Sequence, residues 1–312
     1  MRVFVAGATG AIGRRLVPLL VERGHEVTGM TRSSEKTGAL RGMGSEPALC
    51  DVFDADALRE VVVGAAPEVV VHELTDLPPA LDPRKLEEQT AGNDRIREDG
   101  TRNLVTAARA AGARRIVAQS IAFAYAPTGE PVKTEADPLF DDAAWPWSRS
   151  VTALHALEDA VAKADGLDGL VLRYGWFYGP GTSYASDGRQ AQEVRRRRFP
   201  VVGTGTGVFS FVHVDDAAAA TVAAIERGAP GIYNVVDDEP ARMRDWLPVY
   251  AQAIGAKRPW RVPVFVARLA VGRQAAGMAT GLRGASNARA KEALGWQPRY
   301  PSWRQGFREA LG

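Results

Sequence analysis

Three glycines near the start of the chain have the spacing of a phosphate-binding turn. Gly7, Gly10 and Gly13 lie in the stretch VFVAGATGAIGRR, between an apolar run at 3–6 and a helical pattern that begins near residue 12. Glycine allows a tight turn, a close approach of backbone to phosphate, and close packing of the helix on the strand. The N–H groups at the helix start can then bind phosphate oxygens. The residues expected at the phosphates are Gly7, Thr9, Gly10, Ala11, Ile12 and Gly13. The alternative is a glycine turn with a structural role alone.

A basic residue follows the second apolar run, at a position where many dinucleotide sites have an acidic residue. NAD sites place Asp or Glu there, because a carboxylate accepts a hydrogen bond from the ribose 2′-hydroxyl. This chain has Thr31, Arg32 and Ser33 instead. A guanidinium can bind a 2′-phosphate through two N–H groups, and the neighbouring hydroxyls can donate to it. The sequence therefore predicts NADP(H) as cofactor, and the alternative is an arginine exposed in a turn.

Short apolar runs that alternate with helical patterns must position these residues. Runs rich in Val and Ile lie at 3–6, 26–30, 46–49, 69–72, 115–119 and 170–174, and helical patterns lie at 12–23, 55–64, 95–111 and 151–164. Strands without strict alternation are typical of parallel sheets covered on both faces. The sequence predicts an α/β fold with a Rossmann-type doubly wound parallel sheet, whose ligand sites lie at the carboxyl ends of the strands.

The second half of the chain has a different pattern, which indicates a small substrate-binding lobe. We expect a dinucleotide-binding domain at 1–175, to which 209–236 returns, and a C-terminal lobe formed by 176–208 and 237–312. The expected substrate pocket comprises 145–147, 176–178, Tyr184 and 195–211, and its tryptophans favour an apolar or aromatic substrate. Those tryptophans could instead cover the core. The run RRRR at 195–198 is either a solvated helix face or a wall against an anionic group.

Six segments together resemble the extended short-chain dehydrogenase/reductases, which include nucleotide-sugar epimerases and dehydratases. They are GATGAIG (7–13), CDVFDADAL (50–58), VVVHEL (69–74), GTRNLVTAARAAGARRIVAQS (100–120), LRYGWFYGPGT (172–182) and FSFVHVDDAAAATVAAIE (209–226). The resemblance implies Asp51 and Val52 at the adenine, and Glu73 and Leu74 at the ribose. It also implies that Gln119 and Ser120 border the nicotinamide. Tyr174 occupies the position where relatives commonly have Pro, which puts another hydroxyl near the ring, and Trp176 is a further expected cofactor contact.

The chain departs from the family at the catalytic pair. Relatives carry Tyr-x-x-x-Lys on the helix after the strand that ends in Ser, and the Lys lowers the pKa of the phenol so that it exchanges protons at neutral pH. None of the seven tyrosines here has a Lys four residues later. With Glu158 matched to the Glu of that helix, Ser150 occupies the position of the Tyr and Leu154 that of the Lys. The Asn before the GT pair is replaced by Arg97.

Three hydroxyl groups are candidates for the missing proton donor. Hydride transfer requires close placement of the reacting carbons and a group that stabilises or protonates the developing oxyanion. Tyr125 follows the expected strand at 115–119 by a few residues, Ser120 ends that strand, and Tyr174 ends the next. We rank Tyr125 first, then Ser120, then Tyr174. Aromatic packing is the alternative role for both tyrosines.

Composition excludes several classes of function. The 39 Lys and Arg nearly balance the 37 Asp and Glu, so the net charge of +2 gives no reason to expect nucleic acid as partner. A lone cysteine, Cys50, fits a reducing compartment. No apolar run suggests a membrane span or a signal peptide, which favours a cytoplasmic protein without a membrane partner. The four histidines lack metal-ligand spacing, so no metal is expected. No GxSxG turn for a serine nucleophile is present.

Three functions remain open. The first is an NADP(H)-dependent oxidoreductase that acts on a carbonyl, alcohol or enone of a small, largely apolar molecule. The second is an epimerase, dehydratase or cyclase that uses NADP without net redox change. The third is a sensor that binds NADP without catalysis, as the missing Tyr and Lys would allow. Family resemblance adds a homodimer as a possible assembly.

Overall fold

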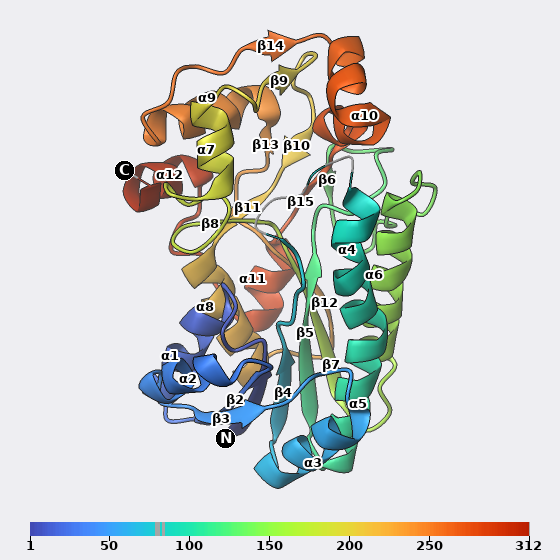
Figure 1. Ribbon diagram of the computed structural model, residues 1–312, viewed down its shortest axis with the longest axis vertical. Coiled ribbons are helices and arrows are strands. Elements are labelled where there is room, and N and C mark those ends of the chain that lie inside the picture. The colour runs from blue at the N-terminus through green and yellow to red at the C-terminus, as the bar shows by residue number, and fades with distance from the viewer. Residues whose placement is uncertain (79–81, 83–84, 312) are drawn as a thin grey trace.

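A seven-stranded parallel sheet forms the centre of the computed structural model, which describes residues 1–78, 82 and 85–311 (Figure 1). The strand order is β12-β7-β5-β4-β1-β2-β3, so the chain changes direction across the sheet between β1 and β4. The strands are β1 (Arg2–Ala6), β2 (Glu26–Thr31), β3 (Glu46–Leu49), β4 (Val69–His72), β5 (Arg115–Ile121), β7 (Asp168–Tyr174) and β12 (Gly231–Val235). The expected doubly wound sheet is therefore confirmed.

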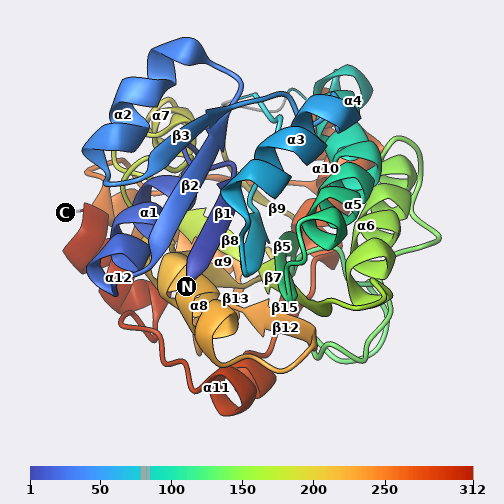
Figure 2. The same cartoon turned by 90° about the horizontal axis from the view of Figure 1, so that it is seen from below.

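Helices cover both faces of this sheet (Figure 2). One face carries α1 (Gly13–Glu22), α2 (Thr37–Gly42) and α8 (Val214–Glu226), and the other carries α3 (Ala55–Ala65), α4 (Leu86–Arg95), α5 (Thr101–Ala110) and α6 (Trp147–Ala162). Two apolar clusters, one on each face, bury the Val and Ile side chains of the strands. Burial on both faces explains why the strand segments are continuous apolar runs rather than alternating ones.

The helix expected at 95–111 corresponds to a π-helical turn followed by α5, and the preceding helix α4 was not predicted. Helix α4 ends at Arg95, a wide π-helical turn follows at Ile96–Gly100, and α5 begins at Thr101. Periodicity alone does not distinguish such a turn from a regular helix, since it adds one residue without breaking the apolar face. The π turn carries Arg97.

Beyond the sheet, the C-terminal half forms a second set of packed elements (upper part of Figure 1). They are α7 (Arg189–Arg195), β9 (Val201–Val202), β10 (Val208–Phe209), β13 (Ala241–Arg242), α9 (Met243–Ala253), β14 (Arg261–Val262), α10 (Val264–Gly281) and α12 (Trp303–Leu311). Short pairings connect β8 (Trp176–Tyr178) to β11 (Phe211–His213), and β6 (Val132–Lys133) to β15 (Gly284–Ala285). Helix α11 (Ala288–Leu294) packs back on the sheet core through Ala290 and Leu294. The expected division into two domains stays a prediction.

Candidate cofactor cleft and substrate cavity

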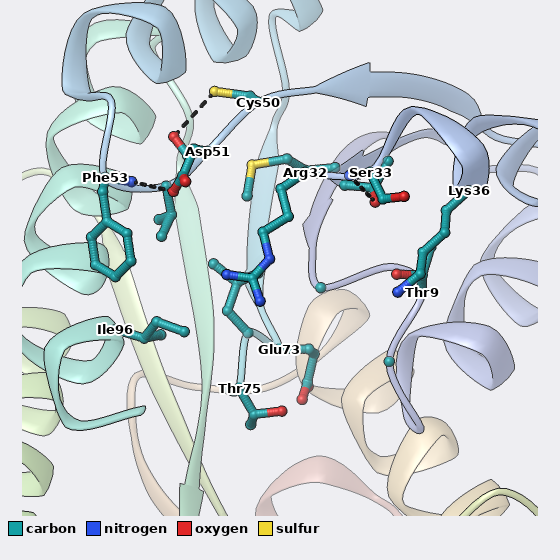
Figure 3. A pocket seen from close by; sticks show the side chains of 16 residues that line it. Thr9, Arg32, Ser33, Lys36, Cys50, Asp51, Phe53, Glu73, Thr75 and Ile96 are labelled. Carbon is teal, nitrogen blue, oxygen red and sulfur yellow. Dashed lines mark hydrogen bonds between the residues drawn. The ribbon is translucent and has the colours of Figure 1, made fainter. Parts of the chain in front are cut away.

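A cleft of about 230 Å³ lies at the carboxyl ends of β1, β2, β3 and β4 (Figure 3). Its position at the change of strand order is where doubly wound folds bind their ligands. The lining residues are Gly7, Thr9, Gly10, Met30, Thr31, Arg32, Ser33, Lys36, Cys50, Asp51, Val52, Phe53, Glu73, Leu74, Thr75 and Ile96.

The glycine turn has the geometry that a phosphate cradle requires. Gly7 adopts a φ of +91°, and a Cβ atom there would lie 2.4 Å from the carbonyl oxygen of Glu73. A Cβ on Gly13 would lie 2.3 Å from the carbonyl oxygen of Gly7, so only glycine allows this contact between the turn and α1. The backbone N–H of Gly10 donates to the carbonyl of Gly7 over 2.9 Å. These residues fit a dinucleotide pyrophosphate held at the start of α1.

Two cations line the end of the cleft formed by the segment after β2. Arg32 extends into the cleft in Figure 3, and Lys36 lines the same cavity from the 3₁₀ turn at Ser34–Lys36. The Arg32 guanidinium lies 3.2 Å from the Asp76 carboxylate, and both side chains are largely exposed. Lys36 makes no ion pair with any residue in the described ranges. The pair of cations matches the charge of a ribose 2′-phosphate.

Most residues expected at the cofactor line this cleft, but a second set does not. Ala11, Ile12 and Gly13 lie behind the turn, and Gln119, Ser120, Tyr174 and Trp176 lie outside the cleft. The sequence interpretation missed Lys36, Met30, Cys50, Phe53, Thr75 and Ile96. Lys36 follows Arg32 by four residues, a spacing that could have indicated a second cation beside the same turn. No comparable sequence pattern indicated the apolar residues among them.

Glu73 is a buried carboxyl group beside the glycine turn. Its Oε1 accepts a hydrogen bond of 3.2 Å from the hydroxyl of Tyr174, while Oε2 is buried without a partner. Burial raises the pKa of Glu73 to about 8, against a smaller opposing effect of the Tyr174 hydrogen bond. Tyr174 is fully buried and also contacts the Thr221 hydroxyl at 2.7 Å. Its phenol therefore has no open face towards a substrate, and it supports Glu73.

The free energy of unfolding is expected to fall as the pH rises from about 4.5 to about 8. In this range Glu73 is ionised in the unfolded chain but still protonated in the folded protein. The folded state keeps the proton up to about pH 8, whereas the unfolded carboxyl loses it near its ordinary pKa of 4.5. The slope is ~1.4 kcal/mol per pH unit over that window, and the loss is complete above it. Glu73→Gln removes this slope, so its melting temperature should exceed that of the wild type at pH 8 and approach it at pH 5. Equal pH slopes for the two proteins would contradict this assignment.

Two of the expected proton donors belong to one buried polar network. Ser120 donates to Glu158 Oε1 over 2.7 Å, and Arg173 binds Glu158 through Nε at 2.8 Å and Nη2 at 2.6 Å. Arg173 Nη1 also donates to the Tyr125 hydroxyl, which donates in turn to Asn234 Oδ1 over 2.7 Å. Burial raises the pKa of the Tyr125 phenol although Arg173 opposes this. Tyr125 is therefore a neutral phenol at physiological pH.

Loss of the charge on Glu158 is expected to destabilise the fold by about 3–5 kcal/mol, because it leaves Arg173 buried without a counterion. Both side chains are about 5% exposed. Glu158→Gln keeps the volume and isolates the charge, and the free energy of unfolding from urea titration measures the effect. The matched control is Asp159→Asn on the next residue, whose pair with Lys163 is 63–73% exposed. We expect a change below about 0.5 kcal/mol there, and equal effects for the two variants would be inconsistent with a buried pair.

A second cavity, of about 340 Å³, has aromatic and apolar walls. It lies between the segment after β5, the start of α6 and the end of α10. Its lining residues are Phe123, Tyr125, Pro127, Phe140, Ala143, Ala144, Trp147, Gly277, Gly281 and Leu282. No charged side chain lines it among the residues that the structure describes. Tyr125 lines it, but its hydroxyl is bonded to Arg173 and Asn234, so the cavity fits a flat apolar body rather than a sugar.

Of the residues expected in the substrate pocket, Trp147 lines this cavity and the others lie elsewhere. Tyr178 and Tyr184 are buried in the aromatic core of the C-terminal elements. Trp176 stacks on Phe123, with ring centroids 4.1 Å apart. Trp145 is exposed, and its Nε1 donates to Glu87 over 3.1 Å. The four arginines at 195–198 are exposed, as expected of a solvated face.

Residues 3–235 match the model of the NAD dependent epimerase/dehydratase family. This match covers most of the chain. The protein belongs to this family. Among the described residues, no helix has the length and apolar character needed to cross a membrane.

Similar proteins in this family are named as reductases and epimerases. A 3-diazoavenalumate denitrifying reductase of Streptomyces is 49% identical, over 98% of this chain and 99% of its own. UDP-glucose 4-epimerase of Thermotoga maritima, solved with UDP-glucose, has a TM-score of 0.77 at 22% identity, over 100% of this chain and 97% of its own. The human epimerase family protein SDR39U1, solved with NADPH, has a TM-score of 0.74 at 23% identity, over 100% and 99%. The last two show the fold alone.

Ser150 and Leu154, which we expect at the positions of the family's Tyr and Lys, have other partners in the structure. Ser150 donates to Asp94 Oδ2 over 3.0 Å, and Arg97 Nη1 lies 3.4 Å from Asp94 Oδ1. Leu154 is buried in the apolar core beside Val151. Burial raises the pKa of Asp94, with Arg97 opposing it. This part of α6 therefore supplies neither a phenol nor an ammonium group for acid–base chemistry.

Proposed function

We propose that this protein is an NADP(H)-dependent reductase of a small aromatic compound. The observation that carries the proposal is the combination of a dinucleotide cleft, with Arg32 and Lys36 at the 2′-phosphate position, and a separate aromatic cavity without charge. Sugar nucleotides need polar groups for their hydroxyls and diphosphate, which the described lining of this cavity does not offer. The lining of this cavity therefore supports an aromatic substrate rather than a nucleotide sugar.

One set of residues binds the cofactor, and another positions the substrate. When bound, the reduced nicotinamide supplies a hydride for transfer to the substrate. The glycine turn holds the pyrophosphate, and Arg32 and Lys36 bind the 2′-phosphate. The walls formed by Phe140 and Trp147 orient a flat ring and exclude water from it.

Reductive removal of a diazo group is the substrate chemistry that we propose first. The relative that is 49% identical over nearly its whole length is named a denitrifying reductase of a diazo compound. When hydride replaces the diazonium group of an arene, the C–N bond breaks, dinitrogen leaves with the bonding pair, and a C–H bond forms. No proton is transferred. Such a reaction needs neither the Tyr nor the Lys that Ser150 and Leu154 replace.

Reduction of an aromatic carbonyl or enone is the second candidate, favoured by one observation. Tyr125 lines an otherwise apolar cavity, and Arg173 and Asn234 fix the position of its hydroxyl. Carbonyl reduction requires a proton on the developing alkoxide, which this phenol would supply.

A panel of matched arenes tests both candidates. The purified protein is assayed for NADPH oxidation with an aryldiazonium salt, an aryl ketone and an aryl enone that share one ring. We expect diazonium reduction, unchanged in Tyr125→Phe, whereas ketone reduction should fall at least about 100-fold in that variant. Product without NADPH oxidation would indicate the non-redox alternative. Binding of NADPH without turnover of any compound would favour the sensor alternative and end the reductase proposal.

A further inference from the structure

Arg283 joins the two segments that meet at the rim of the aromatic cavity. Its Nη1 donates to the carbonyl oxygen of Gly281 over 3.2 Å, and its Nη2 donates to the carbonyl oxygen of Pro127. Both partner residues line the cavity. They also lie against each other, since a Cβ on Gly281 would be 3.6 Å from the Cβ of Pro127. The guanidinium therefore lies directly behind the rim, partly exposed.

The charge of this guanidinium has no counterion. Its hydrogen-bond partners are two neutral carbonyl groups, and no Asp or Glu of the described part of the chain lies within ion-pair distance. Nε is buried without any partner. Arg173 is more deeply buried than Arg283, and its charge is matched by the carboxylate of Glu158. Arginine keeps its proton in proteins, so the unmatched charge and the unused donors carry a free-energy cost that an anionic ligand would remove.

We propose that Arg283 binds the carboxylate of an aromatic acid whose ring occupies the cavity. The inference rests on the proposed function and names its substrate class. A guanidinium offers a fork of N–H groups that matches a carboxylate. With an apolar cavity and a cation directly behind its rim, the site fits a molecule that is flat and apolar at one end and anionic at the other. Arg283 would fix which end enters, and so which carbon faces the cofactor.

Binding of two matched probes tests this assignment without turnover. Cinnamate and cinnamamide share a ring and a chain but differ in charge, and calorimetry gives the affinity of each. We expect cinnamate to bind about tenfold or more tightly than cinnamamide to the wild type. Arg283→Met should abolish the difference and leave cinnamamide unchanged, and Arg283→Lys should restore part of it as a point charge. Arg289→Met is the control for net charge, because Arg289 is an exposed residue on α11.

Two results would overturn the inference. One is equal affinity of the wild type for the two probes, which includes failure of both to bind. The other is that Arg283→Met weakens the binding of both probes equally and Arg283→Lys restores the binding of neither. That pattern indicates that Arg283 only maintains the structure of the rim. NADPH affinity is measured on the same samples. Charge-selective probe binding without NADPH binding would leave the inference standing and remove the proposed function.

Discussion

Replacing Arg32 with alanine is expected to weaken NADPH binding by about 10–100-fold and to leave NADH binding unchanged. The guanidinium lines the cleft beside Thr31 and Ser33 and has only an exposed carboxylate as partner. A hydrogen bond to a charged group contributes about 1.5–3 kcal/mol, and NADH lacks the phosphate that receives it. Calorimetric titration of both cofactors into wild type and variant measures the effect.

Two further variants separate cofactor binding from a structural role of Arg32. Lys36→Ala should also weaken NADPH binding. The double variant should lose less binding free energy than the sum of the two single losses, because both cations act on one phosphate. Asp76→Ala should strengthen NADPH binding, because Arg32 loses its competing partner at 3.2 Å. If Asp76→Ala weakens NADPH binding as much as Arg32→Ala does, the ion pair between Arg32 and Asp76 maintains the shape of the cleft. The assignment of Arg32 to the 2′-phosphate would then be wrong.

Filling the aromatic cavity is expected to weaken substrate turnover strongly without affecting cofactor binding. Gly281→Phe places a ring at the rim, where a Cβ would contact the Cβ of Pro127 at 3.6 Å and nothing nearer. Exclusion of an aromatic substrate ring loses about 2–3 kcal/mol of burial, so kcat/KM should fall on the order of 100-fold. NADPH affinity should stay at the wild-type value, since the cavity and the cleft share no lining residue.

The matched control for this variant is Gly281→Ala, which adds the Cβ alone at ordinary van der Waals distance. Its kcat/KM is expected to stay within about twofold of the wild type, because the added methyl fills little of the cavity. Turnover by Gly281→Phe at the wild-type rate would show that the substrate binds elsewhere. Equal loss in both variants would indicate a backbone effect at the end of α10.

Local patterns predicted the sheet well because its determinants are local. The strand runs at 46–49 and 69–72 coincide with β3 and β4, and the segment 209–236 that was expected to return to the sheet contains β12. Buried parallel strands must be continuously apolar, and the glycine turn must follow the first of them, so periodicity and Gly spacing suffice. Arg32 was expected at the cleft for the same reason, since the fold fixes the position after β2, and the structure places it in the cleft lining.

The substrate cavity could not be predicted because its walls come from distant segments. Pro127 and Gly281 meet across 154 residues of sequence, through a contact that no local pattern encodes. Trp176 and Tyr184 were expected at the pocket on residue type, but large aromatic side chains also stabilise the core, and the structure buries Tyr184 against Trp246. The partners of Tyr174 are also distant in sequence: Glu73 follows β4 directly and Thr221 comes from α8.

The most direct test of the account follows the hydrogen that is transferred. NADPH that carries deuterium at the transferable position of its nicotinamide is incubated with the protein and a carboxylated aryldiazonium, and the arene product is analysed by mass spectrometry. The account predicts one deuterium in the product, at the carbon that carried the diazo group, with one NADPH oxidised for each molecule formed. Product without deuterium, or deuterium incorporation that persists unchanged in Gly281→Phe, would contradict reduction by NADPH in this cavity.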